Sequence, residues 1–225
     1  HLAWHWPLGQ RLIRRAARQA RDLGLDPAVL DATLLIAWCD GTTVYVHLYG
    51  DGCLAVRRAD GGIATIRVEY AENAPYYLSY LLDPERWALY QEAIGEPETA
   101  QSIYYQSDVA ESNRQERFDA PTVFSFDLAT FPVVAVATDG LDSFVSAETG
   151  ARLDLQPVAH TMLDFHRLDG AFVQRRLREA LADYAQREVI NVDDIGMGAF
   201  VRRLDGWAVQ ALPMNSKVPV WEMPP

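Results

Sequence analysis

The sequence is poor in cysteine and in long apolar runs, and each lack excludes a class of protein. Its two cysteines, Cys39 and Cys53, are too few for a disulfide framework or for a zinc site built from thiolates. They favour a reduced, cytoplasmic setting. No apolar run approaches the roughly 18 to 20 residues that a membrane-spanning helix requires, so we expect no membrane as a partner.

Positive charge is also in short supply. The chain holds 31 Asp and Glu against 20 Lys and Arg, which gives a formal net charge of -11. Such a chain is repelled by the phosphates of nucleic acids and by anionic lipid surfaces. We therefore expect no nucleic acid as a partner, and we expect a metal ion, a small molecule or a protein instead.

The length and composition are sufficient for one sizeable hydrophobic core. The chain has 225 residues, of which 49% are hydrophobic and 11% aromatic. A chain of this size buries most of its apolar surface in a single domain. We expect residues 1–225 to form one domain.

Residues 8–23 predict an amphipathic helix, because apolar residues recur there at spacings of three and four. The remaining positions hold five arginines, namely Arg11, Arg14, Arg15, Arg18 and Arg21. A basic face of this kind is either a solvated helix surface or a docking surface for an acidic partner or phosphoprotein.

The next hundred residues predict strands, a helix and a loop. In residues 33–70, β-rich runs alternate with the turn sequences DGTT, GDG and ADGG, which is typical of an antiparallel meander of three or four strands. Asp83 followed by Pro84 predicts the capped start of a short helix. Residues 95–120 are polar and acidic, and we interpret them as a loop or an irregular excursion.

The second half of the chain continues this mixture. Residues 122–128 and 132–138 predict two strands, and the second is apolar on both faces, so we place it at the centre of a sheet. Residues 170–187 predict a long amphipathic helix, and residues 191–212 predict a strand, a turn and a strand. The order of elements predicts an α+β fold with largely antiparallel sheets and with helices outside them.

Three acidic positions stand beside apolar runs and glycines: Asp51 in YGDG, Asp139 in ATDG, and the pair Asp193 and Asp194 in VDDIG. Glycine lets a strand stop abruptly and leaves the neighbouring carboxylate uncovered. Two carboxylates about 4 Å apart repel by roughly 4 kcal/mol at an effective dielectric near 20, so converging acids need a cation. Oxygen-only ligation favours Mg²⁺ or Mn²⁺ over zinc.

The same dipeptide has an ordinary structural meaning, because Asp-Gly is common in tight turns. The chain has it at positions 40, 51, 60, 139, 169 and 205. We interpret Asp40, Asp60 and Asp205 as turn residues, and for Asp51 both interpretations stay open. Asp139 is the stronger ligand candidate, because the run VVAVAT before it is too apolar for an exposed hairpin.

Three stretches taken together resemble the metal-dependent protein phosphatases of type 2C. TLLIAWCDGTTVYVHLYGDGCLAVRR is similar to that family's central strands, with a DG turn and then a glycine-aspartate step. VVAVATDGLDSF is similar to its strand that ends in aspartate-glycine with a second acid after it, and VDDIGMGAFV to its closing aspartate motif before a strand. The order and spacing of these stretches carry the resemblance, which covers roughly residues 8 to 203.

The resemblance implies a four-layer αββα sandwich, in which helices flank two antiparallel sheets and a site for two Mn²⁺ or Mg²⁺ ions lies at one end. Asp139 and Asp193 would be direct metal ligands, Asp51 would stand where the family can hold an additional, weaker metal, and Asp142 would support these ligands. Gly140 and Asp194 are further site candidates. Asp194 takes the place of the commoner asparagine and adds negative charge.

The implied activity is that of a serine/threonine phosphoprotein phosphatase, in which a metal-activated water attacks the phosphoester without a covalent enzyme intermediate. The implied partners are a phosphorylated protein substrate and a cognate serine/threonine kinase. The alternative is a catalytically inactive module on the same fold, which binds a phosphoprotein or a kinase.

One departure from the family pattern bears on the choice between an active phosphatase and an inactive module. The family's first strand, whose terminal aspartate bridges both metals, has no counterpart in the sequence, and neither has the upstream basic residue that binds phosphate. Either the natural protein has these elements upstream, or this is a member without turnover. An uncovered sheet edge is unfavourable, so we favour the first explanation.

Overall fold

The structure is a computed structural model that describes residues 1–202. The α-helices are α1 (His5–Asp22), α2 (Pro84–Ile94), α3 (Leu155–Met162) and α4 (Phe172–Gln186). The strands are β1 (Leu34–Cys39), β2 (Thr43–Tyr49), β3 (Gly52–Arg57), β4 (Ile63–Tyr70), β5 (Gln101–Ser107), β6 (Glu111–Glu116), β7 (Val123–Asp127), β8 (Val133–Ala137), β9 (Phe144–Ser146), β10 (Val189–Asn191) and β11 (Met197–Val201).

The strands form two large sheets. One has three strands in the order β1-β2-β7, and the other has six in the order β11-β8-β3-β4-β5-β6. All neighbours in both sheets pair in antiparallel fashion. β9 and β10 form a separate antiparallel pair. The predicted antiparallel α+β class is confirmed.

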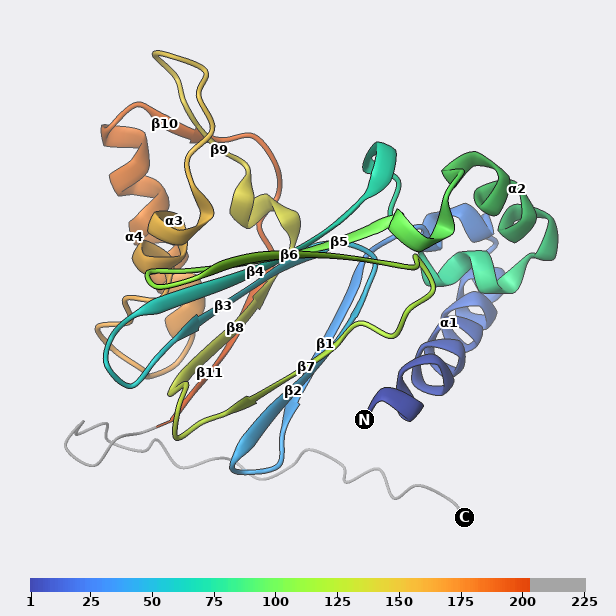
Figure 1. Cartoon of the computed structure of the whole chain (residues 1–225), viewed down its shortest axis with the longest axis horizontal. Coiled ribbons are helices and arrows are strands. Elements are labelled where there is room, and N and C mark those ends of the chain that lie inside the picture. Colours follow the sequence, from blue (N-terminus) through green and yellow to red (C-terminus); the bar gives the residue numbers. More distant parts are fainter. Residues whose placement is uncertain (203–225) are drawn as a thin grey trace.

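The sheets pack face to face with helices outside them, as Figure 1 shows. Val46 of β2 and Leu54 of β3 belong to the core between the sheets. Ala55, the next residue of β3, points to the other side and packs with α3 and α4. On the opposite face, Ile13 of α1 packs against Tyr49 of β2. This period-two alternation gives the predicted αββα order of layers.

The meander predicted for residues 33–70 is wrong in one respect, because its four strands belong to two sheets. β1 and β2 lie in the three-stranded sheet, whereas β3 and β4 lie in the six-stranded sheet. The chain crosses between them at Gly50, Asp51 and Gly52, where the glycines have φ of 94° and 139°. Residues other than glycine rarely adopt such φ angles. Asp51 therefore lies on the crossover between the two sheets.

The loop predicted for residues 95–120 is also wrong, because it contains β5 and β6. β5 pairs with β4 and buries Gln101 and Ile103. β6 is the outer strand of its sheet, and its residues are almost all exposed. A polar edge strand has no apolar period that would distinguish it from a loop, and its charges protect the edge from other strands.

Several other elements follow the sequence prediction. Asp83 caps α2 by accepting hydrogen bonds from the backbone amides of Glu85 and Arg86 at 2.9 and 3.4 Å. β8 lies between β11 and β3, so its central place is confirmed. α1 and α4 lie where helices are expected, whereas α3 is an element that the sequence did not predict.

The hairpin predicted for residues 191–212 is only partly described. β11 is its first strand, and its second strand, together with Asp205, lies outside the described residues. Between residues 1 and 202, no helix combines the length and the apolar character needed to cross a membrane.

Candidate acidic site at the crossover between the sheets

Three of the predicted acids lie beside strand ends that meet at one end of the six-stranded sheet. Asp51 directly precedes β3, Asp139 follows β8 by two residues, and Asp193 precedes β11 by four. In the sheet, Ala137 at the end of β8 pairs with Cys53 of β3 and with Met197 of β11. Antiparallel pairing thus gathers the three acids from distant parts of the sequence.

The environment of Asp139 disfavours its charged form. The pKa of Asp139 is raised, first by partial burial and then by the negative charges of Asp51 and Asp193. Hydrogen bonds from the backbone amides of Asp139 and Gly140 oppose this rise. No ion pair within residues 1–202 involves any of the three acids. A cation would relieve their mutual repulsion.

Thr138 fastens the end of β8 to the segment that carries Asp193 and Asp194. Its hydroxyl donates to the backbone carbonyl of Asp194 at 3.0 Å and accepts from the backbone amide of Gly196 at 3.0 Å. Its own backbone amide donates to the carbonyl of Gly196 at 2.9 Å. These bonds hold Asp193 near Asp139 without using either carboxylate.

Gly140 has its own reason to be glycine. A Cβ atom at this position would overlap the backbone carbonyl of Asp194, so only a hydrogen leaves room for the chain to pass. The predicted site residues Gly140 and Asp194 therefore meet through their backbones. The side chain of Asp194 itself is exposed, as is that of Asp193.

Thr33 holds Asp51 from the side of the three-stranded sheet. The Thr33 hydroxyl donates a hydrogen bond to Oδ1 of Asp51. Thr33 also packs closely on Gly50, where an added Cβ would lie 2.8 Å from its Oγ1. Sequence reasoning missed both Thr33 and Thr138, because each acts through a partner that is distant in the chain.

Asp142 has a different environment from the other acids. Only 3% of its side chain is exposed, and its Oδ2 lies 2.7 Å from Nη1 of Arg67 and 3.4 Å from Nη2 of Arg152. Two guanidinium groups thus compensate its charge. Its carboxylate anchors the turn after β8, and any support that it gives to Asp139 is indirect.

The fit of these acids to a divalent metal is partial. Within residues 1–202, no group of three or more His, Cys, Asp or Glu side chains is arranged to hold a metal ion. The three aspartates therefore do not form a closed ligand set. Mg²⁺, however, is usually bound by one or two carboxylates, with water and phosphate oxygens as the other ligands. The uncompensated pair Asp139 and Asp193 fits that chemistry.

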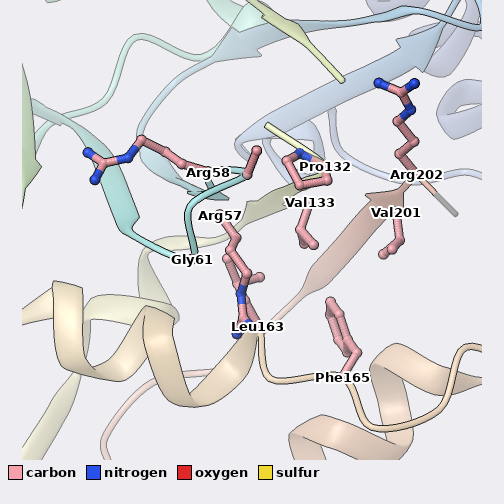
Figure 2. Close-up of a pocket in the computed structure, with 10 residues that line it drawn as sticks. Arg57, Arg58, Gly61, Pro132, Val133, Leu163, Phe165, Val201 and Arg202 are labelled. Atoms are coloured by element: carbon pink, nitrogen blue, oxygen red, sulfur yellow. The ribbon is translucent and has the colours of Figure 1, made fainter. Parts of the chain in front are cut away.

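A concavity lies at the opposite end of the same sheet, and its volume is ≈ 140 Å³. It is basic and apolar, and in Figure 2 Arg57 extends toward Leu163, whereas Arg58 and Arg202 extend away from it. Within the described residues, Nε and Nη2 of Arg57 are buried without a hydrogen-bond partner. The carboxylate of Asp164 stands 4.0 Å from Nη2. This environment does not suit a metal ion.

No protein family model matches the chain, and no curated protein is similar enough in sequence to count as a relative. The acidic site itself is therefore the basis for inferring a function.

Proposed function

We propose that the protein is a divalent-metal-dependent phosphatase that acts on phosphoserine or phosphothreonine in proteins. One observation carries the proposal: three carboxylates without ion-pair partners in the described chain converge at the crossover between the sheets, and two of them raise the pKa of the third. Bound Mn²⁺ or Mg²⁺ would supply a water of lowered pKa and would neutralise phosphate charge.

The three acids differ in how the surrounding structure positions their carboxylates. Asp139 follows a strand that is hydrogen-bonded on both sides, and Asp193 belongs to the segment that Thr138 fastens, so these two are the principal ligands in the proposal. Asp51 already accepts a hydrogen bond from Thr33 through one oxygen, which suits a weaker, additional ligand. Rigid support of this kind is what a preorganised site requires.

A catalytically inactive module is the second candidate, because the described residues contain no closed group of three ligands. Such a module would bind a phosphoprotein or a kinase through the same end of the sandwich without turnover. In both cases we place the protein in the cytoplasm, where its free thiols Cys39 and Cys53 would stay reduced.

The decisive experiment is hydrolysis of an aryl phosphate in the presence of Mn²⁺, with a chelator as the blank. We expect metal-dependent turnover that falls about 100-fold or more in Asp139→Asn, because a direct ligand is lost. Asp60→Asn is the matched control, since Asp60 is also followed by glycine but lies in the turn at the far end of β3. It should keep the parent's activity.

Metal binding separates the two candidates from each other. Titration with Mn²⁺ in a calorimeter should show binding by the parent and by Asp60→Asn, and weaker binding by Asp139→Asn and Asp193→Asn. Binding of a phosphopeptide without its hydrolysis would favour the inactive module. A full-length natural protein that neither binds Mn²⁺ nor hydrolyses the substrate would refute the phosphatase.

A further inference from the structure

An apolar groove runs beside α1 on the outer face of the three-stranded sheet. Two adjoining cavities, of ≈ 640 and ≈ 460 Å³, share Leu8 of α1 and Ile36 of β1. Leu34 and Ile36 form part of the floor, and Leu8 and Leu12 form part of the wall. The groove thus lies between a helix and the outer face of a strand.

α1 has two apolar stripes, and only one of them is used in packing. The buried stripe consists of His5, Gly9, Ile13, Ala17 and Ala20. The second stripe, made of Leu8, Leu12 and Ala16, recurs every fourth residue and stays half-buried. A helix needs one stripe to pack on a sheet, so the second can receive another element.

More apolar surface surrounds the groove. Trp4 lines one of the cavities with 67% of its surface exposed, and Val29 lines the other with 54% exposed. Exposed apolar residues that cluster in this way mark interaction surfaces, whereas single ones are ordinary.

The floor of the groove includes side chains of an outer strand. β1 pairs with β2 on one side only, and it is the outer strand of its sheet. Its sequence, LLIAWC, contains no charge and no proline, the devices that commonly protect an edge strand. The outward side chains of this strand that line the groove, Leu34, Ile36 and Trp38, are therefore all apolar.

The charge at the rim indicates the chemistry of the occupant. Arg11 and Arg15 line the groove, and both are exposed. Neither cavity has an aspartate or glutamate among its lining residues, although the whole chain has a formal net charge of -11. A positive rim on an otherwise acidic protein favours a partner with acidic residues.

We propose that this groove binds an amphipathic helix of a partner protein, with leucine-like residues on one face and Asp or Glu beside them. The wall from Leu8 to Gln19 extends about 16 Å, which is about three helical turns. The opposite sheet is covered by two α-helices, α3 and α4 (Figure 1). This sheet packs against one α-helix, α1, and the short helical turn Leu78–Leu82, and the groove lies beside α1. A docked helix occupies the corresponding second position.

The groove also reaches the acidic site. Thr33 lines its inner end, and the hydroxyl of Thr33 donates to Asp51. A bound helix therefore contacts the residue that holds one of the three acids. Docking itself does not depend on the proposed phosphatase activity, since none of the groove residues is a metal-ligand candidate.

The test uses a fluorescein-labelled helical peptide of about five turns, with Leu at positions i, i+3, i+4 and i+7 and Glu beside them. Fluorescence anisotropy measures its binding to the whole chain. We expect the peptide to bind, and we expect a sister peptide with Lys in place of Glu to bind at least about tenfold more weakly.

Two charge-reversed variants localise the binding. Arg11→Glu with Arg15→Glu should weaken binding of the Glu peptide about tenfold, because both residues line the groove. Arg14→Glu with Arg18→Glu is the matched control: it has the same helix, spacing and charge change, but neither residue lines the groove. It should leave the affinity within about twofold.

Three results would overturn the proposal. The first is no binding of the Glu peptide, and the second is an equal loss in both double variants, which would indicate long-range charge alone. The third comes from sedimentation: a dimer that Leu12→Glu abolishes and that the peptide does not displace would make a second copy of the chain the occupant. Each result leaves the Mn²⁺ assay of Asp139 unaffected.

Discussion

The two outer faces of the sandwich are covered in different ways. On the six-stranded sheet, α3 and α4 bury apolar side chains completely, and Val158, Met162 and Ala180 are 0% exposed. On the three-stranded sheet, the buried apolar cluster beneath α1 is small and contains Ile13 and Tyr49. The face covered by α3 and α4 is thus a closed core, whereas the α1 face leaves apolar surface that another molecule can cover.

The α1 face is also more polar. His5 and His47 are buried and stacked with their ring centroids 5.3 Å apart, and His5 stacks on Tyr49 at 4.2 Å. Among the described residues, Nδ1 of His5 and both ring nitrogens of His47 have no hydrogen-bond partner. Burial lowers the pKa of both histidines. The packing of α1 therefore depends on neutral imidazoles.

Truncation of one side chain on each face tests this difference directly. Met162→Ala should lower the free energy of unfolding by about 3 kcal/mol, because it leaves a cavity in a closed core. Leu12→Ala should cost about 1 kcal/mol, because Leu12 is half-buried beside an open groove. Urea unfolding measures both. Equal losses would show that the two faces contribute alike.

Acid should weaken the α1 face selectively. Burial, with a smaller contribution from the charge of His47, lowers the pKa of His5 to about 3, whereas an unfolded histidine titrates near 6.5. The stability that the neutral ring contributes is present above pH 6.5 and is lost as the pH falls toward the folded pKa. Between pH 6.5 and 5 the loss is about 2 kcal/mol.

Urea unfolding over that pH range measures the loss. His5→Phe should remove most of the pH dependence, and His160→Phe, on the exposed side of α3, should leave it unchanged. The same slope in all three proteins would show that His5 is not the group that titrates.

Local patterns in the sequence were enough for most elements of the fold, but not for their assignment to sheets. Periodicity identified α1, β8 and α4, and the Asp83 cap identified α2. The crossover at Asp51 could not be predicted, because the sequence GDG is compatible both with a turn inside one sheet and with a connection to another sheet. β6 could not be predicted either, because an exposed edge strand has no apolar face.

The site shows the same limit. Apolar runs next to glycine or acid pairs identified Asp51, Asp139 and Asp193, and strand pairing places all three at one end of the six-stranded sheet. Pairing across the sheets then decides what each acid contacts. No local pattern shows that Thr33 donates to Asp51, or that Arg67 compensates Asp142, since each pair joins distant parts of the chain.

The acidic site lies where the two sheets meet, and we expect it to weaken the fold that both faces stabilise. The raised pKa of Asp139 means that its proton is held more tightly in the folded state. The associated stability is present below the unfolded pKa of about 3.9 and is lost as the pH rises through the folded pKa. Near pH 7 and without metal, Asp139→Asn should therefore raise Tm, by about 2 °C because solvent screens a partly exposed group. Added Mn²⁺ should raise the Tm of the parent more than that of the variant, since only the parent keeps the ligand. Differential scanning fluorimetry measures both shifts.

The control variant Asp60→Asn should lower Tm instead, because a hydrogen bond from Arg58 lowers the pKa of Asp60. If Asp139→Asn lowered Tm in the same way, neither burial nor the charges of Asp51 and Asp193 would disfavour the Asp139 carboxylate, and a cation would not be needed there.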